Sequence, residues 1–193
     1  QEKSVSRETY CIPVRTVEED ELAFKAGEKL TFTMHYEWGA VNSDVGTGTV
    51  VLDTMRYNGV KAFHCSVYGK TTRLFDLFFK VREDFDSWFA CDGLKPLKFT
   101  RDTHEGHYIA RNTYIYDWNA VEPHIDADVY SSSSGQRNLE LPLTSCTYDL
   151  PSLFFLARNM DIDNIVPGKK YPMTFAIDDD VYNVYFILYG RET

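Results

Sequence analysis

The amino-acid sequence predicts an all-β fold, in which a long antiparallel meander rolls into an open or spiral barrel-like sheet, with one short helix near residues 150–159. Three observations lead to this prediction. Apolar and polar side chains alternate along most of the chain, as in half-buried strands. Short turn signals such as Asn58-Gly59 and Asp92-Gly93 separate the runs. Helical and strand patterns do not alternate, which excludes a parallel sheet, and a long meander must curl to bury one face.

The alternating runs define the expected strands. Leu30–Trp38 places its large apolar side chains on one face and polar ones on the other. The run over residues 44–57 contains Gly46 and Gly48, and glycines inside a strand predict a bend or a bulge. The further expected strands are Val60–Gly69, Lys80–Cys91, a return strand that contains Leu97 and Phe99, His107–Trp118, Val121–Tyr130, Tyr171–Asp178 and Val181–Tyr189.

One helix interrupts the strands. Asp149 can cap it, Pro151 lies in its first turn, and apolar residues recur from Leu153 to Met160. The serine run Ser131–Gly135 reads as a flexible loop. We therefore expect strands on both sides of a single short helix.

Length and composition limit the class of protein. The 193 residues fit an N-terminal arm over residues 1–21 and a single β-rich domain over residues 22–193. The net charge of −9 disfavours nucleic acid as a partner, because such binding relies on cationic side chains at phosphates. No apolar run approaches the roughly 18 residues of a membrane span, so no transmembrane segment is expected.

Four cysteines, Cys11, Cys65, Cys91 and Cys146, are widely spaced. They form no Cys-x-x-Cys motif, which disfavours structural zinc. Two disulfides with three possible connectivities remain open in an oxidising compartment. Because Cys65 and Cys91 lie on apolar strand faces, free or partly paired cysteines are favoured.

The strand Lys80–Cys91 contributes most of the predicted ligand-binding surface. One of its faces is mostly apolar, and the other is charged and ends in a tryptophan. The outward side of the neighbouring strand adds a tyrosine. The predicted ligand-binding side chains are Tyr68, Arg82, Asp84, Asp86 and Trp88.

The charged face has two interpretations. Asp84 and Asp86 lie about 7 Å apart beside an aromatic ring, an arrangement compatible with glycoside hydrolysis. The favoured interpretation is a ladder of ion pairs, in which Lys80 and Arg82 also take part and which meets Arg101 or Arg111.

No catalytic residue, cofactor or metal site is expected. The serines lack a nucleophile-elbow motif. His104, Glu105 and His107 surround a turn and resemble a set of metal ligands, but solvated or hydrogen-bonded histidines are favoured there.

Aromatic rows on two strands also leave two alternatives open. The first row contains Tyr36 and Trp38, and the second contains Tyr108, Tyr114, Tyr116 and Trp118. As core residues they fill a rolled sheet, which is favoured. As an exposed groove they would stack on sugar rings or hold acyl chains.

Four motifs occur in a characteristic order. They are an entry strand (Phe24, Gly27, Glu28, Leu30 and Trp38, with Phe32 in place of a common tyrosine), a core strand (Leu77 to Trp88), a helix (Asp149, Leu150, Ser152, Leu153, Phe155, Ala157 and Arg158) and a turn (Pro167, Gly168, Lys169 and Tyr171). This order resembles an exported bacterial family of unknown function, found in Gram-negative envelopes, with YmcC-like structural relatives.

The resemblance implies an all-β rolled sheet in an exported protein that is periplasmic or associated with the outer membrane. It brings no catalytic residues. Members of the family continue beyond the point that matches Gly190, so the resemblance implies that C-terminal strands are missing here. The start at Gln1 has two explanations, a mature chain that has lost its signal peptide and a trimmed sequence. Together with the resemblance, it favours the first.

The leading expectation is a non-enzymatic cell-envelope protein that binds a surface glycan, a lipid-bearing molecule or an envelope protein. The first alternative is a lipid or lipoprotein carrier with a half-barrel cavity and the helix Asp149–Asn159 as its lid. The second is a carbohydrate-active hydrolase that uses Asp84 and Asp86.

Overall fold

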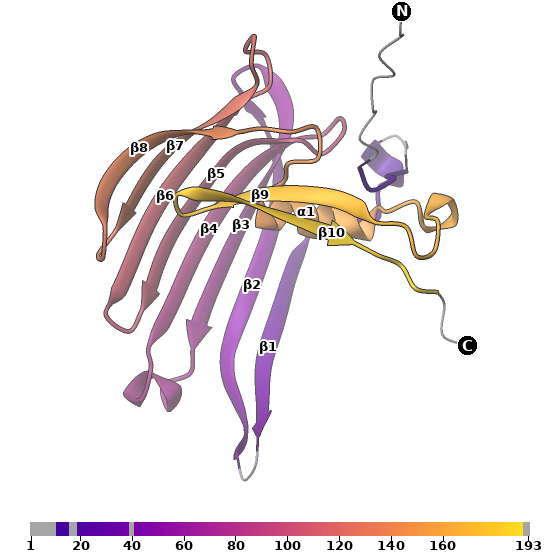
Figure 1. Cartoon of the computed structure of the whole chain (residues 1–193). Coiled ribbons are helices and arrows are strands. Elements are labelled where there is room, and N and C mark those ends of the chain that lie inside the picture. Colours follow the sequence, from indigo (N-terminus) through magenta and orange to yellow (C-terminus); the bar gives the residue numbers. More distant parts are fainter. Residues whose placement is uncertain (1–10, 16–18, 39–40, 191–193) are drawn as a thin grey trace, which may run out of the picture.

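A single antiparallel sheet of eight strands dominates the fold (Figure 1). The computed structural model describes residues 11–15, 19–38 and 41–190. The eight strands pair in sequence order and the sheet is not closed into a barrel, so the prediction of an open, rolled meander is confirmed. The strands are β1 (Lys29–Trp38), β2 (Val41–Tyr57), β3 (Val60–Thr71), β4 (Val81–Ala90), β5 (Pro96–Glu105), β6 (Tyr108–Asp117), β7 (His124–Ser131) and β8 (Gly135–Pro142).

The sheet has two ends that differ in their connections. In the orientation of Figure 1, the connections after β2, β4 and β6 lie at the upper end, and those after β3, β5 and β7 lie at the lower end. The connection after β3 contains a short 3-10 helix, η2 (Phe75–Leu77). Two other 3-10 turns, η1 (Glu19–Glu21) and η3 (Ile162–Asn164), lie outside the sheet.

A bulge bends β2 where the glycines predict it. Met34 pairs with Gly46 and His35 pairs with Asp44, so Val45 is an extra residue in β2. A Cβ atom at Gly46 would lie 2.8 Å from the carbonyl oxygen of Lys70. Gly46 therefore lets β2 and β3 approach each other more closely than any larger residue would.

The predicted helix is confirmed as α1 (Leu150–Arg158). Asp149 caps it: the backbone N–H of Ser152 donates to Asp149 Oδ1 over 2.7 Å, and the N–H of Asp149 donates to Ser152 Oγ over 3.0 Å. Phe155 and Leu156 are buried, and the helix contacts β3 and β4. The helix thus fills part of the inner face of the sheet and does not resemble a lid.

The last two strands do not extend the meander, although the sequence predicts that they do. β9 (Tyr171–Ile177) and β10 (Asp180–Phe186) form a separate hairpin that crosses the inner face (Figure 1). An extended single sheet would leave its inner face in water. By folding across it, the hairpin buries Ala176 with side chains of β5 to β8.

Two apolar clusters form the core, both on the inner face. One lies between α1 and β2 to β4, and the other lies between the hairpin and β5 to β8. The second contains Tyr114 and Tyr116, so the tyrosines at these two positions are core residues, as favoured. The aromatic members of the first cluster are Phe24, Phe63, Phe89, Tyr148, Phe155 and Tyr171.

The described part of the N-terminal arm is attached to the sheet domain. Cys11 and Cys146 form a disulfide, and Val14 makes an antiparallel bridge with Met160. Cys65 and Cys91 are free thiols. The cysteines are therefore partly paired, one of the outcomes the sequence favours. The first ten residues of the predicted N-terminal arm lie outside the described residues.

Strand β8 has no counterpart among the predicted strands. Its residues Gly135 to Pro142 contain only two large apolar side chains, Leu139 and Leu141. As a strand at the edge of the sheet, β8 needs few buried residues, so the alternating pattern is weak.

Candidate functional site

None of the elements that the structure describes covers the lower half of the inner face of the sheet (Figure 1). At this level small residues stand opposite each other: Gly48 of β2 pairs with Gly69 of β3, which in turn pairs with Glu83 of β4. Phe32 of β1 is the partner of Gly48 on the other side. Directly paired residues share a face of the sheet. The two glycines, which have no side chains, therefore leave a depression between Phe32 on one side and the Glu83 carboxyl group on the other.

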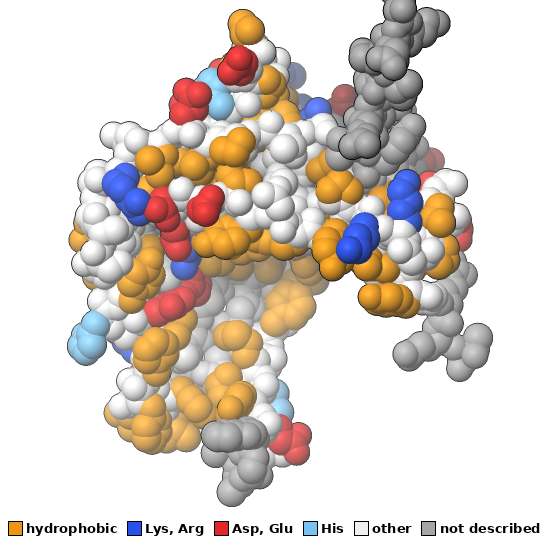
Figure 2. All heavy atoms as spheres, in the orientation of Figure 1, with side chains coloured by type: hydrophobic (Ala, Val, Ile, Leu, Met, Phe, Trp, Pro, Cys, Tyr) orange, Lys and Arg blue, Asp and Glu red, His pale blue; other side chains and the backbone are white. Residues whose placement is uncertain are grey.

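Apolar side chains form one wall of this open half. Phe32 and Met34 of β1 are 46% and 44% exposed, and Tyr36 is similarly exposed. From α1, Phe154 meets Phe32 edge to face at 6.4 Å between ring centroids, and Leu150 is also exposed. Figure 2 shows the resulting hollow below the hairpin, with hydrophobic side chains along it. We call this surface the inner groove.

A pocket of about 240 Å³ forms the deep part of the inner groove. It lies between the sheet, the first turn of α1 and the end of β9. Apolar and charged residues line it together, including Glu83, Phe85, Phe99, Arg101, Glu105 and Leu150. Its volume is below the roughly 300–1,000 Å³ of typical ligand pockets. It therefore fits one end of a ligand whose remainder lies along the open wall.

A chain of hydrogen bonds crosses the floor of this pocket. Thr103 Oγ1 donates to Glu83 Oε2 over 2.6 Å, and Arg101 Nε donates to Thr103 Oγ1 over 2.7 Å. Burial raises the pKa of the Glu83 carboxyl, and the neighbouring Glu105 acts in the same direction. The side-chain oxygens of Glu83 and Glu105 thus offer hydrogen-bond acceptors to a bound polar group.

The tip of the hairpin closes the pocket from above. Asp178 Oδ1 accepts hydrogen bonds from Arg101 and from the Asn112 side chain, each over 3.1 Å. The Tyr114 hydroxyl donates to the Asp178 carbonyl oxygen over 2.9 Å. Because Arg101 is already paired with Asp178, Glu83 and Glu105 leave an excess of negative charge beside the pocket.

The five predicted ligand-binding residues lie on the opposite, outer face. Tyr68 pairs with Asp84, and His64 pairs with Trp88 in the ladder between β3 and β4. Trp88 is already engaged, because His64 stacks on its ring at 4.6 Å and Lys98 Nζ lies 4.8 Å from the ring centroid. The structure thus brings these residues onto one surface, apart from the inner groove; whether they bind a ligand remains a prediction.

The predicted ladder of ion pairs takes a different form. Arg82 pairs with Asp76 of the β3–β4 connection, and Arg111 pairs with Asp102. Arg101 lies on the same face of β5 as Phe99, which is the inner face of the sheet. It therefore does not pair with Asp84 or Asp86 on the outer face. The ladder prediction fails here because strand register, which sequence alone does not specify, sets the partners.

Asp84 and Asp86 border a shallow outer hollow of about 800 Å³. Burial raises the pKa of Asp84, and Asp86 and Asp102 act in the same direction. Asp86 accepts a hydrogen bond from Ser66 and lies 2.8 Å from His64 Nε2. This surface is acidic and polar, and it lacks the apolar walls of the inner groove.

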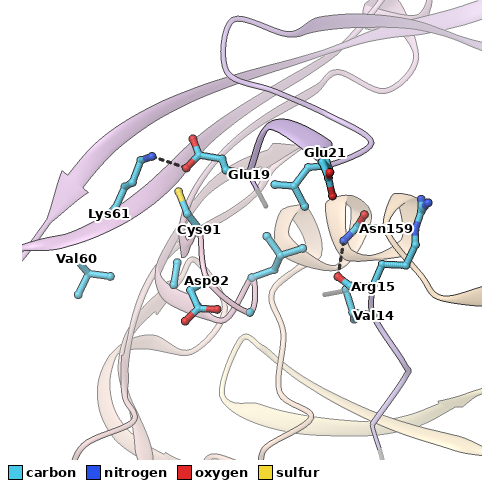
Figure 3. Close-up of a pocket in the computed structure, with 13 residues that line it drawn as sticks. Val14, Arg15, Glu19, Glu21, Val60, Lys61, Cys91, Asp92 and Asn159 are labelled. Atoms are coloured by element: carbon cyan, nitrogen blue, oxygen red, sulfur yellow. Dashed lines mark hydrogen bonds and ion pairs between the residues drawn. The ribbon is translucent and has the colours of Figure 1, made fainter. Parts of the chain in front are cut away.

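A further pocket of about 710 Å³ lies at the upper end, beside the N-terminal arm (Figure 3). Lys61 and Glu19 point toward each other and form an ion pair, and Asn159 Nδ2 donates to the carbonyl oxygen of Arg15 over 3.2 Å. Burial raises the pKa of the Cys91 thiol to about 11, so this cysteine is not an activated nucleophile. This pocket is thus a gap between the N-terminal arm and the sheet domain, which contact each other at its edges.

The described residues contain no group of three or more His, Cys, Asp and Glu side chains that could hold a metal ion. His104 lies 3.0 Å from an oxygen of Asp102 on the outer face, whereas Glu105 lines the inner pocket, so these two side chains lie on opposite faces. In the same part of the chain, no helix is both long and apolar enough to span a membrane.

An open antiparallel sheet, with a helix and a hairpin packed on half of its inner face, defines an all-β domain with an exposed inner groove. Residues 31–193 match the family described as "Protein of unknown function (DUF3108)". The chain belongs to this family. No curated protein and no solved structure matches it.

Sequence reasoning missed the residues of the inner groove. The available signal for Glu83 is that it is the one carboxylate on the mostly apolar face of β4. Arg101 and Thr103 lie on a strand whose pairing is needed to bring them to Glu83. Gly48 and Gly69 open the inner face only because they are direct partners in the β2–β3 pairing, which sequence spacing does not reveal.

Proposed function

We propose that this protein is a non-enzymatic binding protein that holds an amphipathic, lipid-like molecule in the inner groove. The observation that carries the proposal is the exposed apolar wall of β1 and α1, which runs beside a glycine floor into a pocket with carboxylate acceptors. An apolar chain would cover the wall and remove it from water. A head group with hydrogen-bond donors would meet Glu83.

The open form of the groove favours binding over enclosed transport. The upper half of the inner face is filled by side chains, so the described residues do not form a continuous apolar cavity of the kind that a lipid carrier with a helical lid would need. An elongated ligand would lie partly in the pocket and partly along Phe32, Met34 and Phe154.

Three ligands with the same dodecyl chain test this proposal: dodecylammonium, dodecyl maltoside and dodecanoate, titrated by calorimetry below their micelle concentrations. Dodecylammonium is expected to bind most tightly and dodecanoate most weakly, because Glu83 and Glu105 repel an anionic head group. Absence of saturable binding for all three ligands, or tightest binding of dodecanoate, would contradict the proposal.

A charge variant sharpens the same test. Glu83→Gln should narrow the preference for dodecylammonium over dodecanoate by about tenfold, an effect of about 1.4 kcal/mol, while dodecyl maltoside binding changes little. Glu140→Gln removes the same charge from the outer side of β8 and serves as the control. An equal change in the two variants would assign the effect to net charge and not to the groove.

We further propose that the protein is exported and works in a bacterial cell envelope. The Cys11–Cys146 disulfide supports this, because disulfides persist mainly in oxidising compartments. Alkylation of thiols in denaturant at the moment of cell lysis, followed by intact mass measurement, is expected to label Cys65 and Cys91 only. Four labelled cysteines in protein from its native compartment would argue against export.

A further inference from the structure

The connection between β3 and β4 carries an exposed apolar protrusion at the lower end of the sheet. Leu74, Leu77, Phe78 and Phe79 are 59%, 79%, 80% and 55% exposed. Leu77 ends the single turn η2, and the other three flank this turn; we call these four residues the apolar knob. Burying exposed Leu and Phe side chains is strongly favourable, so a cluster of four on one protrusion indicates a surface that meets a partner.

An ion pair holds the knob in shape. Arg82 donates to both carboxylate oxygens of Asp76, over 3.0 and 2.7 Å, and Thr71 Oγ1 also donates to Asp76. The hydrogen bonds from Arg82, then that from Thr71, lower the pKa of Asp76 to about 2. The only carboxylate of this connection is therefore neutralised by a bidentate partner.

The base of the knob packs on the neighbouring turn. The N–H of Gly106 donates to the carbonyl oxygen of Lys80 over 2.8 Å, and a Cβ atom at position 106 would lie 2.9 Å from the Phe79 ring. Gly106 also has a φ of +60°. Only glycine fits this position without strain, so the knob is a built feature of the fold.

The segment that carries the knob has a charge opposite to that of the whole chain. The segment Lys70–Arg82 contains four basic residues and one acidic residue, whereas the chain carries a net charge of −9. With Asp76 and Arg82 paired, Lys70, Arg73 and Lys80 remain as positive charges beside exposed leucine and phenylalanine. This combination is typical of segments that enter the interface of an anionic membrane.

We propose that the apolar knob docks this protein on the surface of an anionic lipid bilayer. The four apolar side chains enter the boundary between head groups and acyl chains, and Arg73 and Lys80 contact lipid phosphates. A second copy of the chain fits this surface less well, because two acidic molecules repel each other and the knob carries no acidic patch for the partner's basic residues.

Docking through the knob would place the inner groove beside the membrane. Thr71, at the start of the connection, pairs with Gly46 of β2, and Val81, at its end, pairs with Glu105 of the pocket. The knob and the open half of the groove thus share the lower end of the sheet. The inference goes beyond the groove's ligand, because membrane docking does not require the groove to be occupied.

Co-sedimentation of the full chain with vesicles tests the proposal, using phosphatidylcholine vesicles with and without phosphatidylglycerol. We expect binding to the anionic vesicles that weakens as salt is added. Leu77→Ser together with Phe78→Ser should lower the partition coefficient at least about tenfold. Val121→Ser is the control, because Val121 is fully exposed at the opposite, upper end.

The charge contribution is tested by Arg73→Glu together with Lys80→Glu. This variant should lose most of its preference for phosphatidylglycerol, whereas Lys25→Glu with Lys29→Glu, the same charge change near the upper end, should keep it. Equal losses in both variants would overturn the proposal in favour of a non-specific effect of net charge.

A fluorescent reporter locates the inserted segment. Tryptophan at position 78 (Phe78→Trp) should shift its emission to the blue when anionic vesicles are added, and Val121→Trp should not. If vesicles bind no wild-type protein, and light scattering shows that the serine variant of the knob changes the oligomeric state, the knob is a protein interface and the proposal is wrong.

The experiments distinguish failure of the membrane-docking proposal from failure of the proposed ligand binding in the inner groove. The knob variants keep all residues of the inner groove, so they should bind dodecylammonium like the wild-type protein. Loss of ligand binding with retained vesicle binding would contradict the proposed function and leave the docking proposal intact.

Discussion

The two halves of the inner face use the same strands for different purposes. In the upper half, large side chains such as Leu52 and Phe63 face α1 and the hairpin and are fully buried. In the lower half, Gly48 and Gly69 occupy the same faces of the same strands, and the apolar residues of β1 stay exposed. The comparison shows that the upper half holds the fold together, whereas the lower half is left open at a cost in stability.

Two neighbouring phenylalanines on α1 give the largest expected contrast. Phe155 is fully buried among Phe24 and Phe89, whereas Phe154 faces the groove. Phe155→Ala should lower the free energy of unfolding by about 4 kcal/mol. Phe154→Ala should lower it by about 1 kcal/mol and weaken dodecylammonium binding instead. Urea unfolding of both variants measures these losses. Similar losses in the two variants would contradict the claim that the upper half, and not the lower half, stabilises the fold.

The next largest effect concerns a carboxyl group in the covered half. Burial raises the pKa of Asp149 to about 6, although Ser152 and Ser87 donate hydrogen bonds to it. A folded-state pKa above the unfolded value means that the native protein binds the proton more tightly. Its contribution to stability is therefore present below pH 4 and is lost as the pH rises through 6.

The variant Asp149→Asn isolates this contribution. The free energy of unfolding of the variant, relative to wild type, should rise by about 3 kcal/mol between pH 4 and pH 7.5. Comparison with wild type at each pH removes the effects of all other carboxyl groups. A difference that does not change with pH would show that Asp149 is less buried than the structure indicates.

Two tyrosines under the hairpin provide a smaller contrast. The Tyr114 hydroxyl donates to the Asp178 carbonyl oxygen, whereas the buried Tyr116 hydroxyl has no hydrogen-bond partner among the residues that the structure describes. Tyr114→Phe should therefore destabilise the protein by about 1 kcal/mol, and Tyr116→Phe should stabilise it by about the same amount. Thermal unfolding of the two variants measures these changes, and opposite signs are the expected result.

The sequence predicted the parts of the fold that depend on local patterns. The alternation along β4 and β6 correctly assigned their inner faces, and Asp149 was correctly identified as the helix cap. It did not predict that β9 and β10 leave the meander, because that choice depends on which surface the completed sheet leaves uncovered.

The same limit applies to the inner groove. Glu83, Arg101 and Thr103 come together through strand pairing, and Asp178 reaches them only because the hairpin crosses the sheet. Four of the five predicted residues around Trp88 lie along the single strand β4, where sequence spacing is informative, and only Tyr68 comes from β3. Sites that several strands build together need the register, which the sequence does not state.

The central claim is that the open lower half of the inner face holds the ligand, and Gly48→Val tests it most directly. No atom of the described residues lies within 4 Å of a Cβ placed at Gly48, so valine adds apolar bulk to the groove and strand propensity to β2. Thr49→Val, the next residue along on the outer side of the same strand, is the control. The account predicts that Gly48→Val folds as stably as wild type or better and binds dodecylammonium at least about tenfold more weakly, with Thr49→Val unchanged. Wild-type affinity in Gly48→Val would contradict it.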